Sequence, residues 1–326
     1  MPGQNLTRLE AAERSATVRT QSYDVVLDLT RGETVFGSTT TARFTATPGS
    51  STFIDLVAPT VRSITLNGTP LDPAEVYADS RIALKDLAAD NELVVVADCA
   101  YMHTGEGLHR FTDPADGETY LYSQFEVPDS RRVFAVFEPD LKASFTFTVT
   151  APSSWTVLSN SPTPDPTPTK ASDGSGDAHI FAFAPTEPMS SYVTAIVAGP
   201  YVGATDEYVA EDGRTVPLGV YCRKSLVEHM DSEEILDLTK RGFAYYEDLF
   251  ATPYAFTKYD QVFVPEFNAG AMENAGCVTF RDQYIFRTRP TTADLEARAN
   301  TILHELAHMW FGDLVTMKWW NDLWLN

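Results

Sequence analysis

The sequence predicts a two-domain protein in which an all-β domain over residues 1–200 is followed by an α+β domain over residues 201–326. The length of 326 residues is about two domains of the usual size, roughly 150 residues each. Short runs of β-branched and aromatic residues, separated by Gly, Pro, Asn and Asp, fill the first two hundred positions. A helical period begins only after Ala198-Gly199-Pro200, which places the expected boundary near residue 200.

The strands of the first domain are predicted from runs that alternate or cluster apolar residues between turn residues. The clearest runs are Tyr23–Leu29, Thr39–Ala46, Leu93–Ala97, Ser144–Thr150 and His179–Phe183. Asn67-Gly68 is the two-residue signal of a tight β-hairpin. The stretch 161–177, first Pro-rich and then Gly/Ser-rich, is expected to be an extended surface loop.

The second domain begins with a predicted helix from Ser232 to at least Tyr245. Ser232 precedes two acidic residues, as a helix cap does, and the segment that follows has a helical apolar period. Strands are expected over Gln261–Val264 and Cys277–Phe280.

A second helix is predicted from the spacing of Thr291 and Asp294, which fits a capping box. Gly312 is expected to stop this helix. Its apolar positions are Leu295, Ile302, Leu303, Leu306 and Trp310.

Composition excludes several classes of function. The chain has 45 acidic and 24 basic residues, and a net charge of −21 repels nucleic-acid phosphates and anionic membranes. The three cysteines, Cys99, Cys222 and Cys277, form no CxxC pair, which argues against a disulfide framework or a thiolate metal site. The N-terminal residues do not resemble a secretory signal, and no apolar run is long enough to span a bilayer, so a cytoplasmic location is expected.

The second helix carries a candidate metal site, His304-Glu305-Leu306-Ala307-His308. Two imidazoles four residues apart lie one turn apart on the same helical face, close enough to bind one metal ion. Zinc is expected because it accepts nitrogen and oxygen ligands and keeps a position for water, whose pKa it lowers to about 7. Glu305 would take the proton of this water and pass it to the leaving amine.

The structural alternative for this motif is a helix with two partly buried histidines and no metal. The cap and the length of the helix favour the metal site. The remaining histidines have no such spacing and are expected to be structural or surface residues; they are His103, His109, His179 and His229.

A second cluster, Asn268-Ala269-Gly270-Ala271-Met272-Glu273-Asn274, precedes the histidine motif. Its small residues allow backbones to approach closely, as an edge strand requires if a peptide substrate is to pair with it. Glu273 could bind a cation. Taken alone, the segment is typical of a Gly/Asn loop with an exposed acid.

Together, the motifs Gly270–Asn274 and His304–His308 resemble those of the M1 family of zinc aminopeptidases. Three further stretches are similar to the family, so the resemblance covers essentially the whole chain: Thr104–Glu126, Pro139–Ala143 and Gly312–Asn326. The resemblance implies a saddle-shaped β domain followed by a thermolysin-like catalytic domain, of which residues 201–326 would be a truncated part. It also implies hydrolysis of N-terminal residues from peptides.

The resemblance implies the roles of the catalytic and amine-binding residues. His304 and His308 would bind one zinc ion per chain, and Glu305 would be the general base. Glu126 and Glu273 would hold the substrate's free α-amino group, because a protonated amine prefers charge-assisted acceptors. This recognition would select unblocked N-termini over internal peptide bonds.

The remaining substrate-binding residues are implied by the same resemblance. Gly270 and Ala271 would contact the backbone of the scissile residue, and Met272 and Gln124 would line the first specificity pocket. Asn274 completes this set. The expected partners are peptides with a free N-terminus, with neither nucleic acid nor membrane, and the oligomeric state stays open.

The family's third zinc ligand is a glutamate separated from the second histidine by eighteen residues. Residues 309–326 account for these eighteen positions here, so the third protein ligand is expected just beyond Asn326. The 326 residues alone are therefore expected to have little or no activity.

Other functions remain open at this point. One alternative is a non-catalytic peptide-binding fragment built on the β domain and an impaired metal site. Within the enzymes, a thermolysin-like endopeptidase and an epoxide hydrolase with accessory aminopeptidase activity are the alternatives. The pair of Glu126 and Glu273 favours recognition of a free amine.

Overall fold

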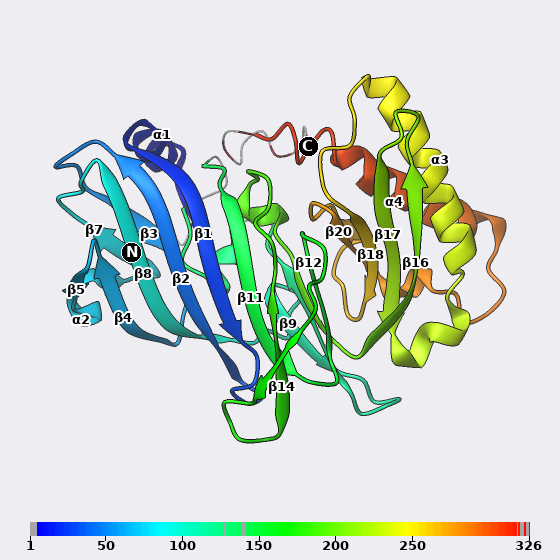
Figure 1. Ribbon diagram of the computed structural model, residues 1–326, viewed down its shortest axis with the longest axis horizontal. Coiled ribbons are helices and arrows are strands. Elements are labelled where there is room, and N and C mark those ends of the chain that lie inside the picture. Colours follow the sequence, from blue (N-terminus) through cyan, green and yellow to red (C-terminus); the bar gives the residue numbers. More distant parts are fainter. Residues whose placement is uncertain (1–4, 127, 138–140, 318, 320–322, 324–325) are drawn as a thin grey trace.

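The structure, a computed structural model, contains a large strand-rich N-terminal region and a smaller C-terminal region that carries the two long helices α3 and α4 (Figure 1). It describes residues 5–126, 128–137, 141–317, 319, 323 and 326. A strand-rich first region followed by a smaller region of mixed helix and strand confirms the expected fold class. Tyr201 opens a new sheet, at the point where the sequence predicts the domain boundary. Positions 139–140, 318, 320–322 and 324–325, within the family-like stretches, lie outside the described residues.

Eight strands form the largest sheet, in the order β13-β14-β11-β1-β2-β8-β4-β5. Their bounds are Val18–Asp28 (β1), Val35–Ala46 (β2), Thr60–Leu66 (β4), Thr69–Leu71 (β5), Asp90–Ala100 (β8), Ser144–Pro152 (β11), Thr167–Lys170 (β13) and Asp177–Ala182 (β14). Strands β1 and β11 are parallel, and the other described neighbours are antiparallel. Each of the five predicted runs overlaps a strand of this sheet. The hairpin at Asn67-Gly68 is also confirmed, with φ values of 51° and 78°.

Two smaller sheets complete the N-terminal region. The four-stranded sheet has the order β12-β15-β10-β9 and the three-stranded sheet the order β3-β7-β6. Their strands are Thr156–Ser159 (β12), Ile196–Gly199 (β15), Thr119–Gln124 (β10), Gly107–Thr112 (β9), Thr52–Asp55 (β3), Arg81–Leu84 (β7) and Tyr77–Ala78 (β6). A single apolar core joins the three sheets, and Tyr23, Phe134, Phe145 and Phe147 form an aromatic group within it.

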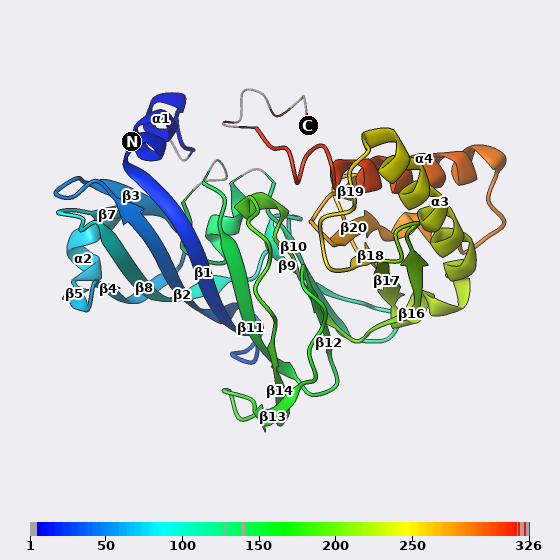
Figure 2. The same ribbon diagram turned by 45° about the horizontal axis from the view of Figure 1, so that its top comes forward.

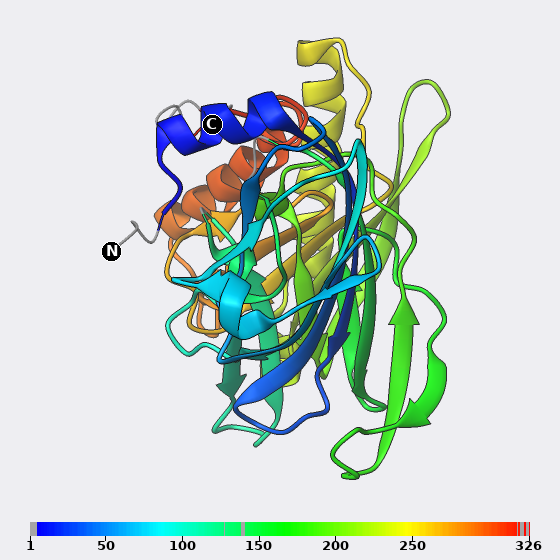
Figure 3. The ribbon, with the colours of Figure 1, turned by 90° about the vertical axis from the view of Figure 1, so that its left-hand side faces the viewer.

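The N-terminal region also contains helices that the strand pattern did not predict. Helix α1 (Arg8–Thr17) lies across one end of the strands (Figure 3). It begins at a capping box in which Thr7 and Glu10 hydrogen-bond reciprocally. The other helical segments are short: α2 (Pro73–Val76) and the 3-10 helices η1 (Asp129–Arg132) and η2 (Ser191–Val193).

The stretch 161–177 is not entirely a loop, so that prediction is wrong for five of its residues, the four of β13 and Asp177, which begins β14. Thr167–Lys170 forms strand β13 and pairs with β14. Because β13 is at the edge of the sheet, it can contain Pro168, which lacks the N–H that an inner strand requires.

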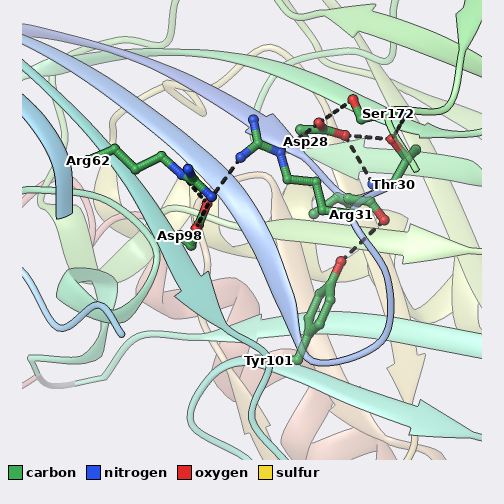
Figure 4. A network of polar contacts seen from close by, with 8 residues as sticks. Asp28, Thr30, Arg31, Arg62, Asp98, Tyr101 and Ser172 are labelled. Atoms are coloured by element: carbon green, nitrogen blue, oxygen red, sulfur yellow. Dashed lines mark hydrogen bonds and ion pairs between the residues drawn. The ribbon is translucent and has the colours of Figure 1, made fainter. Parts of the chain in front are cut away.

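A polar network holds the following turn against the main sheet (Figure 4). Asp28 accepts hydrogen bonds from Ser172 Oγ at 2.6 Å and from Arg31 Nε at 3.0 Å. Arg31 also donates to Asp98 Oδ1 at 3.0 Å, and Asp98 receives two further bonds from Arg62. The guanidinium of Arg62 lowers the pKa of the Asp98 carboxyl. Alternating charges therefore link strands β1, β8 and β4.

The C-terminal region is a five-stranded sheet in the order β16-β17-β18-β20-β19 with helices on one face. Its elements are Tyr201–Val209 (β16), Thr215–Arg223 (β17), Lys224–His229 (η3), Ser232–Phe250 (α3), Tyr259–Val264 (β18), Ala271–Met272 (β19), Cys277–Arg281 (β20), Asp282–Tyr284 (η4) and Thr292–His308 (α4). On β18, Phe263 packs in the core shared with α3 and α4, whereas Val262 and Val264 belong to the N-terminal core. The sheet is therefore buried on both faces, which makes it a rigid support for the groups at its edge.

The ends of the two long helices differ in part from the prediction. Asp231, and not Ser232, is the N-cap of α3, without a side-chain cap bond. Helix α4 begins at the predicted box but ends at His308, before Gly312, because the backbone N–H of Asp313 binds the His308 carbonyl at 2.9 Å. The chain then turns back toward the N-terminal region (Figure 2). Within the described residues, no helix combines the length and the apolar character needed to cross a membrane.

A buried ion cluster joins the two regions. Arg223, at the end of β17, donates to Asp282 from Nε and Nη2 at 2.9 and 2.7 Å and also binds Asp113 in the β9–β10 turn. The three side chains are 7%, 8% and 2% exposed, respectively. Because water cannot compensate their charges, each group depends on its partners.

We expect Arg223→Met to lower the free energy of unfolding by about 3 kcal/mol or more, because it leaves two buried carboxylates without their cation. Urea denaturation measures this change. Arg241→Met is the matched control, since Arg241 is 68% exposed and pairs only with Asp237 on the surface of α3 among the described residues. It should change stability by less than about 0.5 kcal/mol. Equal effects of the two substitutions would show that the cluster does not stabilise the interface.

Candidate metal centre and active site

Helix α4 fixes the positions of the two motif histidines. Ile302 and Leu306 are buried one turn apart and pack the helix on the sheet. His304 and His308 are also one turn apart, and their Nε2 atoms are 3.0 Å from each other with the ring planes at 88°. The helical spacing therefore brings the two imidazoles together as predicted.

The ring nitrogens of His308 are distinguished by their surroundings. Nδ1 lies 3.1 Å from the carbonyl oxygen of Phe311, so a proton on Nδ1 is donated there and Nε2 keeps its lone pair. Burial lowers the pKa of His308, and burial together with the neighbouring imidazole lowers that of His304. Both effects favour the neutral imidazole, which is the form that binds metal ions.

Glu305 lies between the histidines in sequence but is more deeply buried. Glu305 is only 4% exposed. Its Oε2 atom has no hydrogen-bond partner among the described residues. Burial raises the pKa of Glu305 to about 9, and the carboxylates of Glu273 and Glu126 add to the rise. An unpartnered buried carboxyl is unfavourable in a purely structural role and is typical of a functional site.

Strand β19 is the edge strand of the sheet and lies beside α4. On one side it pairs with β20, with Ala271 opposite Phe280. No described strand pairs with its other side. The edge position predicted from the small residues is therefore confirmed. A cavity of about 350 Å³ separates this edge from the helix; it is lined by Gly270, Ala271, Asn300, Thr301, His304 and Glu305. An extended chain in this cavity would meet the free strand edge and the histidine motif together.

Two further glutamates face the same site from different parts of the fold. Glu273 follows β19 and is 6% exposed, and its Oε1 accepts a hydrogen bond from Asn326 Nδ2 at 2.6 Å. Glu126 follows β10 of the N-terminal region. Burial raises the pKa of Glu126 to about 7, with a further contribution from the nearby Glu273 carboxylate. Burial also raises the pKa of Glu273.

The other predicted site residues take up different positions. Gln124 ends β10, and its Oε1 is buried without a described hydrogen-bond partner. Met272 is 1% exposed and packs in the N-terminal core. Asn274 is fully buried and donates to Thr279 Oγ1 at 3.2 Å, which places it beneath the edge strand. Met272 and Asn274 are not among the described residues that line the cavity.

Sequence analysis missed several residues of the site. Asn300 and Thr301 line the cavity, and their spacing of four and three residues before His304 was the available signal, because it places them on the same face of α4. Asn326 contacts both Glu273 and the hydroxyl of Tyr192, at 2.6 and 3.2 Å. No local sequence pattern predicts these long-range contacts.

The side chains at this site fit a bound cation. Glu273, Glu305 and His308 each offer a ligand atom, and these atoms lie within 4.8 Å of one another. His304 adds a second imidazole nitrogen beside that of His308. Nitrogen and carboxylate donors suit zinc, and a positive charge here would favour the ionised forms of the neighbouring carboxyl groups.

Two family models match most of this chain. The model described as Peptidase M1 N-terminal domain matches residues 20–193, and the model described as Peptidase family M1 domain matches residues 234–326. The first match includes Gln124 and Glu126, and the second covers the segment with Glu273 and the helix with the histidine motif.

Curated relatives agree with these matches. Aminopeptidase N of Streptomyces lividans is 59% identical over all of this chain and 37% of its own length. Aminopeptidase Ey of Gallus gallus is 37% identical over 63% of this chain and 21% of its own length. Tricorn protease-interacting factor F2 of Thermoplasma acidophilum is 35% identical over 84% of this chain and 33% of its own length. The chain thus spans little more than a third of these relatives at most.

Proposed function

The chain belongs to peptidase family M1, and on that premise we propose that the protein is a zinc-dependent aminopeptidase that removes N-terminal residues from peptides. The proposal rests on the meeting of two glutamates from different parts of the fold, the buried Glu273 and the half-buried Glu126, with the histidine motif beside a free strand edge. The names of the relatives, two of which are aminopeptidases, support the same reaction class. The three cysteines are unpaired and buried, which supports a cytoplasmic location as part of the proposal.

His304 and His308 would hold the metal through their Nε2 atoms. When bound, zinc supplies a positive charge that activates water and polarises the scissile carbonyl group. The hydrogen-bond contact between His308 Nδ1 and the Phe311 carbonyl orients the ring so that Nε2 faces His304 Nε2 and would be available as a metal ligand. The third protein ligand, predicted just beyond Asn326, is part of the proposal.

Glu305 would transfer the proton in the reaction. Its carboxylate accepts a proton from water as the carbonyl carbon is attacked and donates it to the leaving amine nitrogen. The unpartnered Oε2 is free to accept this proton, since no described side chain or backbone group binds it.

Glu126 and Glu273 would bind the protonated α-amino group and thereby restrict the enzyme to free N-termini. Each carboxylate gains a cationic partner when the amine enters, and this partner offsets the cost of its burial. The backbone of the residue being removed would lie along the unpaired edge at Gly270 and Ala271. The substrates are therefore peptides with an unblocked first residue.

We expect Glu273→Gln in the full-length protein to raise the KM for an aminoacyl chromogenic amide about 10- to 100-fold, because a charge-assisted bond to the amine becomes a neutral one. Steady-state kinetics measure the change. The matched control is Glu296→Gln, on the exposed face of α4, which should leave KM unchanged. A Glu273→Gln protein with the parental KM would contradict the proposed recognition of the free amine.

A further inference from the structure

The proposed amine site is divided between two parts of the fold, which creates a requirement for alignment. Glu126 follows β10 in the four-stranded sheet, and Glu273 follows β19 in the five-stranded sheet. One ammonium group can contact both carboxylates only if these strands keep a fixed separation, since a misplacement of about 1 Å already weakens such contacts strongly.

The segment leading to β19 is attached to the hairpin of β9 and β10. His109 of β9 is fully buried, and its Nε2 lies 3.2 Å from Oε2 of Glu266. The Tyr122 hydroxyl on β10 donates to the Glu266 carbonyl at 3.3 Å. Asn268 Nδ2 donates to the Thr104 carbonyl at 2.5 Å. Two hydrogen bonds thus connect Glu266 with the hairpin that leads to Glu126, and a third connects Asn268 with the loop just before β9.

The hydrogen bonds of His109 assign its tautomer. The backbone N–H of Gly105 donates to His109 Nδ1 at 3.0 Å, so Nδ1 carries no proton. In the neutral ring the proton is then on Nε2, which donates it to the Glu266 carboxylate. The His109 ring also packs on Tyr122, its cross-strand neighbour, at a centroid distance of 4.9 Å. The donor is consequently held in one orientation.

Two backbone features show that the attachment is specific. Glu266 has φ of +53°, a conformation that is unfavourable for a residue with a side chain and persists where its surroundings hold it. Gly105 has φ of +80°, and a side chain at this position would collide with the Asn268 amide. The Asn268 side chain therefore lies directly against the backbone of Gly105, close to the point where the hydrogen bonds form.

We propose that His109 and Glu266 are positioning residues that hold the β19 segment against β10, so that Glu273 and Glu126 are aligned on one α-amino group. The inference rests on the proposed function for the identity of the ligand, whereas the attachment itself stands on the contacts above. Neither residue lines the cavity, so both act through the loop that connects Glu266 to Glu273.

The test compares Glu266→Ala with Glu266→Gln in the full-length protein. The Glu266 side chain is 56% exposed, so its removal leaves the core intact. A positive φ is about as unfavourable for alanine as for glutamate, so the substitution does not relieve backbone strain. We expect Glu266→Ala to raise KM for an aminoacyl amide about 10-fold with kcat within about 2-fold, because ground-state and transition-state binding of the amine weaken together. Glu266→Gln keeps an acceptor oxygen for His109 and should keep KM within about 2-fold.

Hydrogen exchange gives a readout that does not depend on activity. Peptides covering residues 266–276 should exchange about 10-fold faster in Glu266→Ala than in the parent, with the rest of the chain unchanged. Glu228→Ala is the matched control, because Glu228 is exposed, pairs with its neighbour His229 and lies far in sequence from the site. It should alter neither KM nor exchange.

The outcomes separate the two proposals. Parental exchange and parental KM in Glu266→Ala would overturn the inference and show that contacts such as Arg281 Nε to the Ala269 carbonyl, at 3.0 Å, suffice to place the loop. Faster exchange with parental KM would likewise overturn the alignment role. If Glu266→Ala exchanges faster but the parent itself cleaves no aminoacyl amide, the proposed function and the alignment role are both contradicted. The attachment of residues 266–268 would still be established.

Discussion

Glu305→Gln is expected to lower kcat of the full-length protein about 10³-fold, within the range of 10²- to 10⁴-fold that general base catalysis contributes. Gln has nearly the same shape as Glu but cannot accept the proton from water. Because Glu305 is only 4% exposed, bulk water cannot take over its role as proton acceptor. Steady-state rates with an aminoacyl chromogenic amide measure the loss.

Two observations would distinguish lost catalysis from a damaged site. The Glu305→Gln protein should bind zinc as the parent does, because the proposed ligands His304 and His308 are untouched, and metal analysis checks this. Glu305→Asp should also be strongly impaired, since it withdraws the carboxylate by one methylene. A Glu305→Gln protein that retains more than about a tenth of the parental kcat would contradict the assignment of the general base.

His304→Ala is expected to weaken zinc binding by at least about 100-fold and to reduce activity to the same extent at limiting metal. The reason is geometric: His304 and His308 present Nε2 atoms only 3.0 Å apart, so one imidazole cannot replace the chelating pair. Competition with a chelator of known affinity measures the metal binding, and the readout does not require turnover.

His229→Gln is the control for this substitution, because His229 lies on η3 and contacts the surface residue Glu228. Its zinc affinity should match that of the parent. If His304→Ala also bound one zinc ion with parental affinity, the metal would have to be elsewhere in the protein, and the proposed centre on α4 would be wrong.

Local sequence signals predicted the elements whose structure depends on nearby residues. The hairpin at Asn67-Gly68 forms because both residues adopt positive φ, and α4 begins where Thr291 and Asp294 cap each other. The histidine motif is local in the same sense, since a helix alone brings His304 and His308 together. These predictions needed no knowledge of the tertiary fold.

Other boundaries depended on competing local signals or on tertiary contacts. Helix α1 has a capping box at Thr7 and Glu10, but the surrounding strand pattern obscured it. Helix α4 ends at His308, and its end is closed by the bond from the Asp313 N–H to the His308 carbonyl across Gly312, which has φ of +145°. The glycine signal at Gly312 describes this closing contact but not the last helical residue. Strand β13 contains a proline, so it could be predicted only if its position at the edge of the sheet were known.

The assembly of the site is the part that the sequence pattern could not supply. Glu126 and Glu273 are far apart in the chain and meet only because β10 and β19 belong to sheets that pack together. His109 was expected to be a structural or surface residue, and it is structural, but its partner Glu266 is 157 residues away. Such pairs follow from the packing of the two regions, which no local period encodes.

We propose that metal-assisted hydrolysis here depends on a free α-amino group held by Glu126 and Glu273. The most direct measurement is the ratio of kcat/KM for an aminoacyl chromogenic amide and its N-acetylated counterpart, with the zinc-loaded full-length protein. We predict a ratio of at least about 100 in favour of the free amine, because acetylation removes the cation that the Glu126 and Glu273 carboxylates would bind. Equal rates for the two substrates, or hydrolysis of the acetylated one alone, would show that Glu126 and Glu273 do not select the free amine.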